Sequence, residues 1–341
     1  MTDKWFIVDC HNQFVPQEGI LKSRGTTMDL TSGPQAATQK RVTDIEGKLR
    51  VMDEAGIDMA VIHQSPLSLL GLDFCRAMND GNARTAKEYP GRFIACAHIP
   101  LDGGGSPEAC KEVDRAINDL GLKGVALLTS TEKVTLSSEE LFPLYEKINQ
   151  LDVPVVVHPN NIRVSEIVSR LGSGLRVNMH RAIAVETENT EACVDVMFGV
   201  LNKFPDLKFL MPHHGGALPF WQGRMMSQCI PDGWKIPDNV KDIPKTPRIR
   251  RQLGLDKHFA ALFEKLYFDT SGFQGWMPIT QATLLTVRAD RLCFGTDYGF
   301  EMLEAQDIKG FIDDIKKLNM PEADRRNILG ENIRTLFKLH E

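Results

Sequence analysis

Short apolar runs rich in β-branched residues recur along the chain, and segments with the apolar spacing of helices separate them. Alternation of strands and helices is typical of a parallel sheet, and eight parallel strands suggest a closed α/β barrel. The runs that we predict as strands are residues 5–11, 59–65, 92–100, 124–130, 153–159, 207–214, 266–272 and 291–297.

Residues 44–56, 108–121 and 138–151 are predicted to be helices between these strands, and residues 323–339 to be a closing pair of amphipathic helices. Two regions break the alternation. Residues 14–40 cluster Pro, Gly, Thr and Ser, and residues 229–252 are rich in proline. We interpret both as long loops, either over the active-site face or on the plain surface, within a single barrel domain of residues 1–341.

Charge and cysteine content exclude several classes of protein. The formal net charge is -5 and the charges are mixed, with no basic block, so we predict no nucleic-acid partner. The 7 cysteines have no C-x-x-C spacing, which favours buried thiols in a cytoplasmic protein over disulfides or a zinc cluster. We find neither a signal peptide nor an apolar stretch of roughly 18 residues, so we expect no membrane association.

The predicted strands end in polar residues that are unusual for such apolar runs. In an eight-stranded α/β barrel these carboxyl ends meet around one central cavity. One histidine there is more typical of a structural residue, but the joint pattern indicates a functional site. The residues are Asp9, His11, His63, His98, Ser130, His158, His213, His214, Asp269 and Asp297.

His11, His158 and Asp297 supply two imidazoles and a carboxylate from the first, fifth and eighth predicted strands. Such a set suits zinc, manganese or iron and leaves coordination positions for water and substrate. We therefore predict one divalent metal ion, zinc or manganese. Asp9 is either an outer partner of this site or a structural residue at the strand end.

The stretch MPHHGGALPFWQGR, residues 211–224, is a second signal. Gly215 and Gly216 open the backbone after a strand, which leaves His213 or His214 facing the cavity as a general acid or base. The alternative is a glycine-rich strand-to-helix turn with incidental histidines.

Taken in order, VDCH, VVVHP, FPDLKFLMPHHGGALPF, LYFDTSG, FGTDYGFE and NILGENIRTLF resemble the aminocarboxymuconate-semialdehyde decarboxylase branch of the amidohydrolase superfamily. The resemblance covers nearly the whole chain. It implies a TIM-like (β/α)8 barrel of the amidohydrolase type and one divalent metal. The implied activity is either non-oxidative decarboxylation or hydrolysis.

Carried over residue by residue, the resemblance places the metal ligands at His11, His158 and Asp297 and the catalytic histidine at His213. His214 stands where a glycine is more usual, and we group it with the substrate-binding candidates. Arg224 matches an arginine that, in the family's decarboxylases, reaches the neighbouring subunit's site to bind the substrate carboxylate. A homodimer or homotetramer is therefore implied, and a structural ion pair is the alternative for Arg224.

Gln13 departs from the family's usual Asp-x-His-x-His pattern. Some aromatic-acid decarboxylases of the branch replace one or both histidines, so this departure does not argue against a metal. Gln13 either binds the metal, in which case its carbonyl oxygen favours manganese or magnesium over zinc, or donates a hydrogen bond to substrate or to metal-bound water. His63 either lines the substrate pocket or fills the barrel mouth.

These residues favour a metal-dependent lyase, a carboxy-lyase that decarboxylates a small aromatic or unsaturated carboxylic acid. The alternative is a metal-dependent hydrolase of an amide, lactone or C–C bond in a small cyclic or aromatic-derived substrate, in which His213 or Asp297 takes a proton from water. A barrel that only binds or scaffolds is a third class. The altered first strand and the presence of Arg224 favour decarboxylation of a small-molecule carboxylate.

Overall fold

The computed structural model describes residues 4–23, 36–160, 175–229 and 247–339. Its eight strands form one parallel sheet in the order of the sequence. They are β1(Val8–Gln13), β2(Met59–His63), β3(Phe93–His98), β4(Gly124–Leu128), β5(Val155–His158), β6(Phe209–Met211), β7(Tyr267–Asp269) and β8(Leu292–Cys293). Each of them overlaps one of the predicted runs.

The last strand returns to the first, so the sheet closes on itself. Asn12 forms a parallel bridge with Tyr298, and the Cys10 amide donates to the Phe294 carbonyl over 2.9 Å. The predicted α/β barrel is therefore confirmed.

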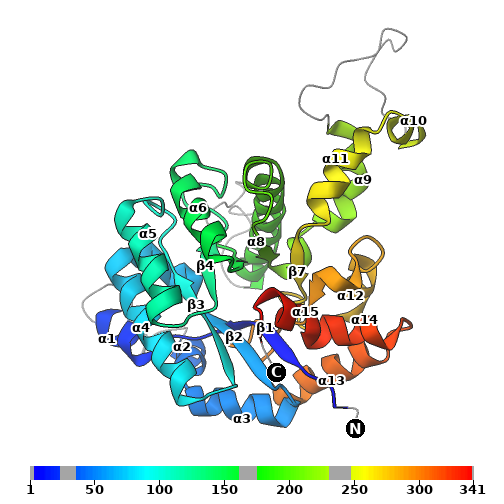
Figure 1. Ribbon diagram of the computed structural model, residues 1–341. Coiled ribbons are helices and arrows are strands. Elements are labelled where there is room, and N and C mark those ends of the chain that lie inside the picture. The colour runs from blue at the N-terminus through cyan, green and yellow to red at the C-terminus, as the bar shows by residue number, and fades with distance from the viewer. Residues whose placement is uncertain (1–3, 24–35, 161–174, 230–246, 340–341) are drawn as a thin grey trace.

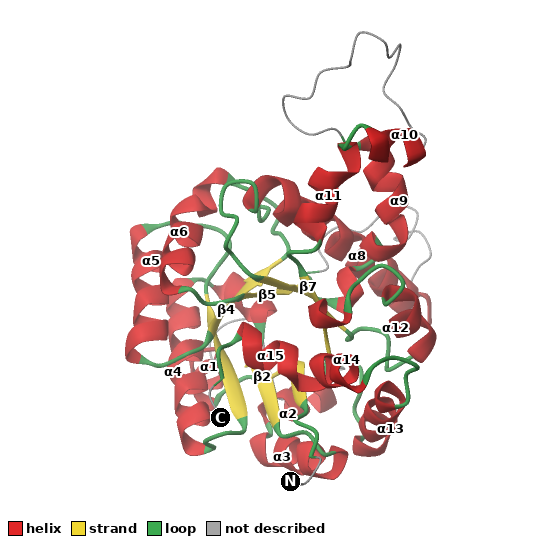
Figure 2. Cartoon of the chain, turned by 45° about the vertical axis from the view of Figure 1, so that its right-hand side comes forward, coloured by secondary structure: helices red, strands yellow, loops and turns green. Residues whose placement is uncertain are grey.

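Helices surround the strands on the outside (Figures 1 and 2). The predicted helix at 44–56 is α3, which begins after Asp44, whose carboxylate accepts from the Gly47 amide, and ends at Gly56 in the left-handed conformation. The α-helices are α1(Gln17–Ser23), α2(Ala36–Thr43), α3(Ile45–Ala55), α4(Leu72–Glu88), α5(Pro107–Asp114), α6(Phe142–Leu151), α8(Leu175–Asp195), α9(Leu218–Gln228), α10(Pro247–Gln252), α11(Leu255–Phe263), α12(Met277–Thr283), α13(Ala305–Lys316), α14(Glu322–Arg326) and α15(Asn332–Leu336).

Three details differ from the sequence-based expectation. The region 14–40, expected to be a loop, contains α1 and α2, and the end of the region 229–252 is α10; residues 24–35 and 230–246 lie outside the described residues. The expected C-terminal pair is one helical run, because a π-helical segment, Asn327–Glu331, joins α14 to α15. Local clusters of Pro, Gly and Ser thus did not prevent short helices from forming.

The interior of the barrel is apolar at one end. Val8, Cys10, Val61, Ile94 and Cys96 pack there with residues of the other strands, and Ile333, Leu336 and Phe337 close that end from the C-terminal helix. The first residues of β2 and β7, Met59 and Tyr267, border the same cluster, so it lies at the amino ends of the strands. The carboxyl ends are left as the open mouth of the barrel.

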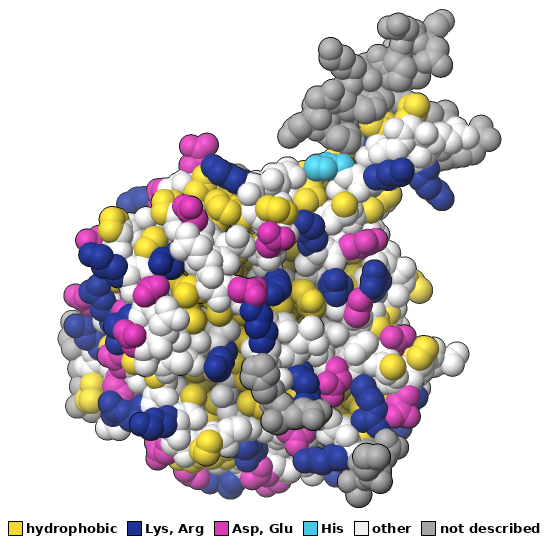
Figure 3. All heavy atoms as spheres, in the orientation of Figure 1, with side chains coloured by type: hydrophobic (Ala, Val, Ile, Leu, Met, Phe, Trp, Pro, Cys, Tyr) yellow, Lys and Arg dark blue, Asp and Glu magenta, His cyan; other side chains and the backbone are white. Residues whose placement is uncertain are grey.

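The outer surface agrees with the mixed charge of the sequence. On the face shown in Figure 3, Lys and Arg side chains alternate with Asp and Glu side chains. In the described part of the chain, no helix combines the length and the apolar character needed to cross a bilayer.

Candidate active site

An irregularity in β1 turns two polar side chains into the barrel mouth. Asp9 pairs with Ala60 and Asn12 with Ile62, so β1 has one more residue than β2 in this interval. Val8 and Cys10 face the apolar interior, whereas Asp9 and Asn12 bond to each other behind the strand through a 2.7 Å hydrogen bond. The extra residue shifts the alternation, which brings His11 and Gln13 to the inner face.

The structure brings His11, His63, His158 and His213 together with Asp297. The His11 ring centroid lies 5.0 Å from that of His63, 5.2 Å from that of His158 and 5.7 Å from that of His213. His11, His213 and Asp297 each offer a ligand atom within 4.8 Å of the others. These five residues belong to or follow five different strands, β1, β2, β5, β6 and β8, so their meeting depends on closure of the barrel.

The outer nitrogens of two histidines have acceptor partners. His11 Nδ1 lies 2.8 Å from Asp269 Oδ2, and both side chains are buried; His158 Nδ1 lies 2.7 Å from the Pro159 carbonyl. A carboxylate and a carbonyl only accept, so both Nδ1 atoms donate and both Nε2 lone pairs face the cluster. This tautomer is the one a metal ligand needs.

Asp269 is the residue whose role sequence reasoning missed. Burial alone would lower the pKa of His11, but the charge of Asp269 and its hydrogen bond outweigh burial and raise it. Burial alone would raise the pKa of Asp269, but the charge and hydrogen bond of His11, the charge of His213 and the Ser271 hydrogen bond together hold it well below its usual range. The polar end of LYFDTSG signalled a functional strand end, but only the closed barrel shows which histidine Asp269 meets.

The side-chain nitrogen of Gln13 lies among the predicted ligands. Nε2 is 2.7 Å from His158 Nε2, 3.0 Å from Asp297 Oδ1 and 3.2 Å from His11 Nε2. Two imidazole lone pairs and a carboxylate oxygen therefore converge on one buried point. A set of this chemistry fits one divalent cation.

His213 is aligned by a carboxylate from α8. Its Nδ1 lies 2.8 Å from Glu186 Oε1, and its Nε2 is buried with no hydrogen-bond partner among the described residues. Burial alone would lower the pKa of His213, but the charge of Glu186 and its hydrogen bond raise it to about 9. Gly272 lies against this ring, since a Cβ built there would come within 2.4 Å of His213 Cγ. His213 thus presents a buried Nε2 to the cluster.

His63 and His98 differ although both end strands. His63 borders His11 and His158, and within the described ranges its buried Nε2 has no hydrogen-bond partner. His98 accepts from the Gln64 amide over 2.8 Å, and burial lowers its pKa to about 4. His63 faces the cluster, and His98 is a structural residue behind it.

Two predicted substrate-binding residues lie apart from the cluster. His214 turns toward α12, where its Nδ1 lies 3.0 Å from Thr283 Oγ1 and its ring packs on Phe273. Arg224 is exposed on α9, and no hydrogen bond or ion pair between described residues joins its side chain to the cluster. Within one chain, no contact between described residues joins either side chain to the cluster.

A buried lysine, also missed by sequence reasoning, fixes the end of β1. Lys48 of α3 donates to the Gln13 carbonyl over 2.9 Å and to the Asn12 side chain, and its Nζ lies 4.5 Å from the Tyr298 ring centroid. Burial lowers the pKa of Lys48 to about 7, although Asp9 and Asp44 oppose this shift. The apolar spacing of residues 44–56 predicted the helix, but it did not indicate that Lys48 is buried and bonded to β1.

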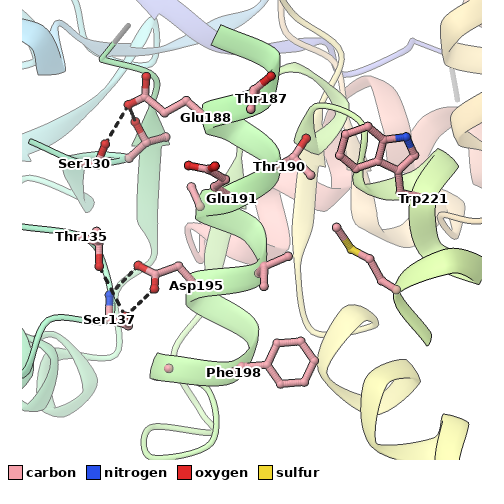
Figure 4. Close-up of a pocket in the computed structure, with 15 residues that line it drawn as sticks. Ser130, Thr135, Ser137, Thr187, Glu188, Thr190, Glu191, Asp195, Phe198 and Trp221 are labelled. Atoms are coloured by element: carbon pink, nitrogen blue, oxygen red, sulfur yellow. Dashed lines mark hydrogen bonds between the residues drawn. The ribbon is translucent and has the colours of Figure 1, made fainter. Parts of the chain in front are cut away.

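A separate cavity, lined by none of the cluster residues, lies beside this site. It measures about 630 Å³ and lies between α8, α9 and the segment after β4. Figure 4 shows Glu188 and Asp195 of α8 turned toward Ser130 and Ser137. Ser130 Oγ donates to Glu188 Oε1 over 3.1 Å, and the Ser137 amide donates to Asp195 Oδ2 over 2.8 Å. These bonds hold α8, which also carries Glu186, against the barrel.

A family model described as amidohydrolase matches residues 8–339. The chain belongs to the amidohydrolase family. It is 28% identical to a gamma-resorcylate decarboxylase of Polaromonas sp. strain JS666 over 96% of this chain and 97% of that enzyme. It is 24% identical to a 2-amino-3-carboxymuconate-6-semialdehyde decarboxylase of Dictyostelium discoideum over 85% of this chain and 75% of that enzyme.

A solved structure with the same fold is a dihydroxybenzoic acid decarboxylase from Polaromonas sp. JS666 with bound manganese and the inhibitor 2-nitroresorcinol. The TM-score is 0.70 at 22% identity, covering 99% of this chain and 98% of that one. The resemblance to the aminocarboxymuconate-semialdehyde decarboxylase branch, and with it the amidohydrolase type of barrel, is confirmed.

Proposed function

We propose that this amidohydrolase is a metal-dependent carboxy-lyase that decarboxylates a small aromatic or unsaturated carboxylic acid without oxidation. The observation that carries the proposal is the convergence of His11, His158 and Asp297 on one buried point, with His213 beside them. Two curated relatives that match most of the chain are named as decarboxylases, which supports this choice of reaction, although another relative is named as a hydratase.

The proposed metal ligands are His11, His158 and Asp297. Either zinc or manganese suits two imidazoles and a carboxylate, and manganese is the ion in the dihydroxybenzoic acid decarboxylase of the same fold. A bound divalent ion supplies positive charge that binds substrate oxygens and stabilises the carbanion-like state left by decarboxylation.

His213 is the proposed acid. The bond between the substrate carbon and its carboxylate breaks, carbon dioxide leaves, and the electron pair stays on the carbon. Nε2 of His213 then delivers a proton to that carbon. Glu186 keeps the ring in place through Nδ1, so that Nε2 remains the inward nitrogen. Asp297 lies beside His11 and Gln13, and we propose it both as a metal ligand and as a catalytic residue.

His63 and Gln13 are the proposed substrate neighbours within the chain, since both are buried at the cluster. Arg224 is proposed to act from a second copy, in a homodimer or homotetramer, because it is exposed on α9 beside the exposed aromatic residues Phe220 and Trp221. His214 is left out of this set because of its contacts with α12. The five buried cysteines support a reducing compartment, and we propose the cytoplasm.

The test is a substrate panel of hydroxybenzoates, muconates, simple lactones and amides, incubated with the manganese- or zinc-loaded protein. Carbon dioxide release and proton release are followed separately. We expect carbon dioxide from at least one hydroxybenzoate or muconate. Proton release from lactones or amides without carbon dioxide would instead support the hydrolase, and failure to bind either ion would contradict both.

A further inference from the structure

The carboxamide of Gln13 makes an unbalanced set of contacts. Its nitrogen carries two protons but has three acceptors around it, His158 Nε2, Asp297 Oδ1 and His11 Nε2, at 2.7, 3.0 and 3.2 Å. Two of these acceptors, His11 Nε2 and Asp297 Oδ1, are themselves only 3.7 Å apart. The NH₂ group of Gln13 thus places partial positive charge between the three acceptor atoms, at the position where a cation would bind.

The other end of the same group has the opposite problem. Gln13 Oε1 is buried, and none of the described residues donates a hydrogen bond to it. A buried carbonyl oxygen without a donor destabilises the folded protein, because it has given up its hydrogen bonds to water. The group therefore has more acceptors than it needs at its nitrogen and no donor at its oxygen.

The backbone of Gln13 is held firmly, so a change would be confined to the side chain. Its amide donates to the Tyr298 carbonyl over 3.2 Å, and its carbonyl accepts from Lys48 Nζ over 2.9 Å. Rotation of the terminal amide exchanges oxygen and nitrogen without moving the strand. The oxygen is repelled by the three acceptors unless a cation lies with them, so the amide orientation depends on metal binding.

We propose that Gln13 stands in for the cation in the metal-free site and, when a divalent cation binds, turns its Oε1 to the ion as an additional ligand. This inference rests on the proposed metal site of the decarboxylase and reassigns Gln13 from substrate to metal. A neutral amide oxygen is a hard ligand, which favours Mn²⁺ over Zn²⁺ relative to a site with imidazole in that place. Asp297 is the one charged ligand in this set, because the two histidines and Gln13 are neutral. A divalent ion held by the set therefore keeps one net positive charge, which complements a substrate with one carboxylate.

The rotation is tested by NMR of the chain labelled with ¹⁵N in glutamine side chains, with Zn²⁺ and Mg²⁺ as diamagnetic probes. We expect one NH₂ pair, absent from Gln13→Met, to be protected from exchange in the metal-free protein and to lose that protection when Zn²⁺ saturates the site. A pair that stays protected and unshifted at saturation would overturn the rotation.

The ligand role is tested by the Kd of Mn²⁺ and of Zn²⁺ for the wild type, Gln13→Met and Gln13→Glu. Gln13→Met should shift the preference toward Zn²⁺ by at least about tenfold, and Gln13→Glu, of the same shape, should tighten Mn²⁺ by a similar factor because it adds charge. Gln39→Met is the matched control, since Gln39 Oε1 is also buried without a partner among the described residues but lies on α2 outside the cluster.

The outcomes separate the two proposals. An unchanged ratio of the two Kd values in both Gln13 variants, with the wild type still binding metal, would overturn the role of Gln13 alone. A wild type that binds neither ion would instead count against the proposed function. Circular dichroism of each variant checks folding. If Gln13→Met does not fold, the comparison of Gln13→Glu with the wild type still tests the role of Gln13.

Discussion

His11 Nδ1 and Asp269 Oδ2 lie 2.8 Å apart, and both side chains are buried. This pair fixes the His11 tautomer that leaves Nε2 toward the cluster. We expect Asp269→Asn to weaken Mn²⁺ binding by roughly 10- to 100-fold, because the amide neither holds the proton on Nδ1 nor supplies charge. Isothermal titration calorimetry measures the change, and Asp206→Asn, at an exposed position, is the control. Equal affinities of Asp269→Asn and wild type would contradict this role.

Gly272 and the His213 ring are packed so closely that no side chain fits between them. Gly272 has φ +82, and an added Cβ would lie 2.4 Å from His213 Cγ and 2.5 Å from Nδ1. We expect Gly272→Ala to displace the ring from Glu186 and to lower kcat by about 10²-fold, because small misplacements of catalytic groups have effects of that size.

The control for this variant is Gly223→Ala on α9, where an added Cβ meets no described residue within 4 Å. Steady-state kinetics and metal analysis of both proteins check the prediction. Gly223→Ala should retain activity, and both should retain metal. A fully active Gly272→Ala would show that the position of the His213 ring does not limit turnover.

The barrel could be predicted because its strands are apolar runs of the expected length, each ending in a polar residue. The positions of His11, His158 and Asp297 followed from the same logic, since the carboxyl ends of parallel strands meet at one mouth. The irregularity in β1 could not be predicted. Strict alternation from Val8 and Cys10 would turn His11 and Gln13 away from the interior, and only the extra residue in β1 reverses this.

The hydrogen-bond partners of the site residues could not be predicted from the sequence either. Glu186 and His213 come from different elements, as do Lys48 and Gln13, and their contacts depend on how helices dock on the barrel. His213 and His214 are adjacent in the sequence, yet their side chains point in opposite directions. Both residues have the left-handed backbone conformation, with φ 51 for His213 and 58 for His214, and this separates the two side chains. No local pattern distinguishes them.

Metal binding and proton transfer should be separable by substitution. His158→Ala and Asp297→Ala each remove an atom that converges on the cation position, so we expect loss of metal and activity together. His213→Ala should keep the metal and lower kcat by about 10²- to 10⁴-fold, the usual contribution of general acid catalysis. Metal content by plasma emission spectroscopy, measured with kcat, distinguishes the two classes. Full metal content in Asp297→Ala, or near-normal turnover of His213→Ala, would contradict the assignment.

His98 should make stability depend on pH, independently of catalysis. Burial lowers its pKa in the folded protein to about 4 from the ordinary 6.5. Between these values the unfolded chain binds a proton that the folded chain does not, so stability is lost as the pH falls from about 6.5 to about 4. The size of this contribution is at most about 3 kcal/mol.

His98→Gln removes the titrating group while its side-chain oxygen can still accept from the Gln64 amide, as His98 Nε2 does over 2.8 Å. We expect the variant to be less stable than the wild type at pH 7, with a difference in unfolding free energy that shrinks as the pH approaches 4. Urea denaturation of both metal-free proteins across this range measures the difference. His63 and His214 are present in both proteins, so most of their titration cancels in the comparison; His98 makes the smallest of the contributions that lower the pKa of His63. A difference that stays constant with pH would show that His98 does not resist protonation in the folded state.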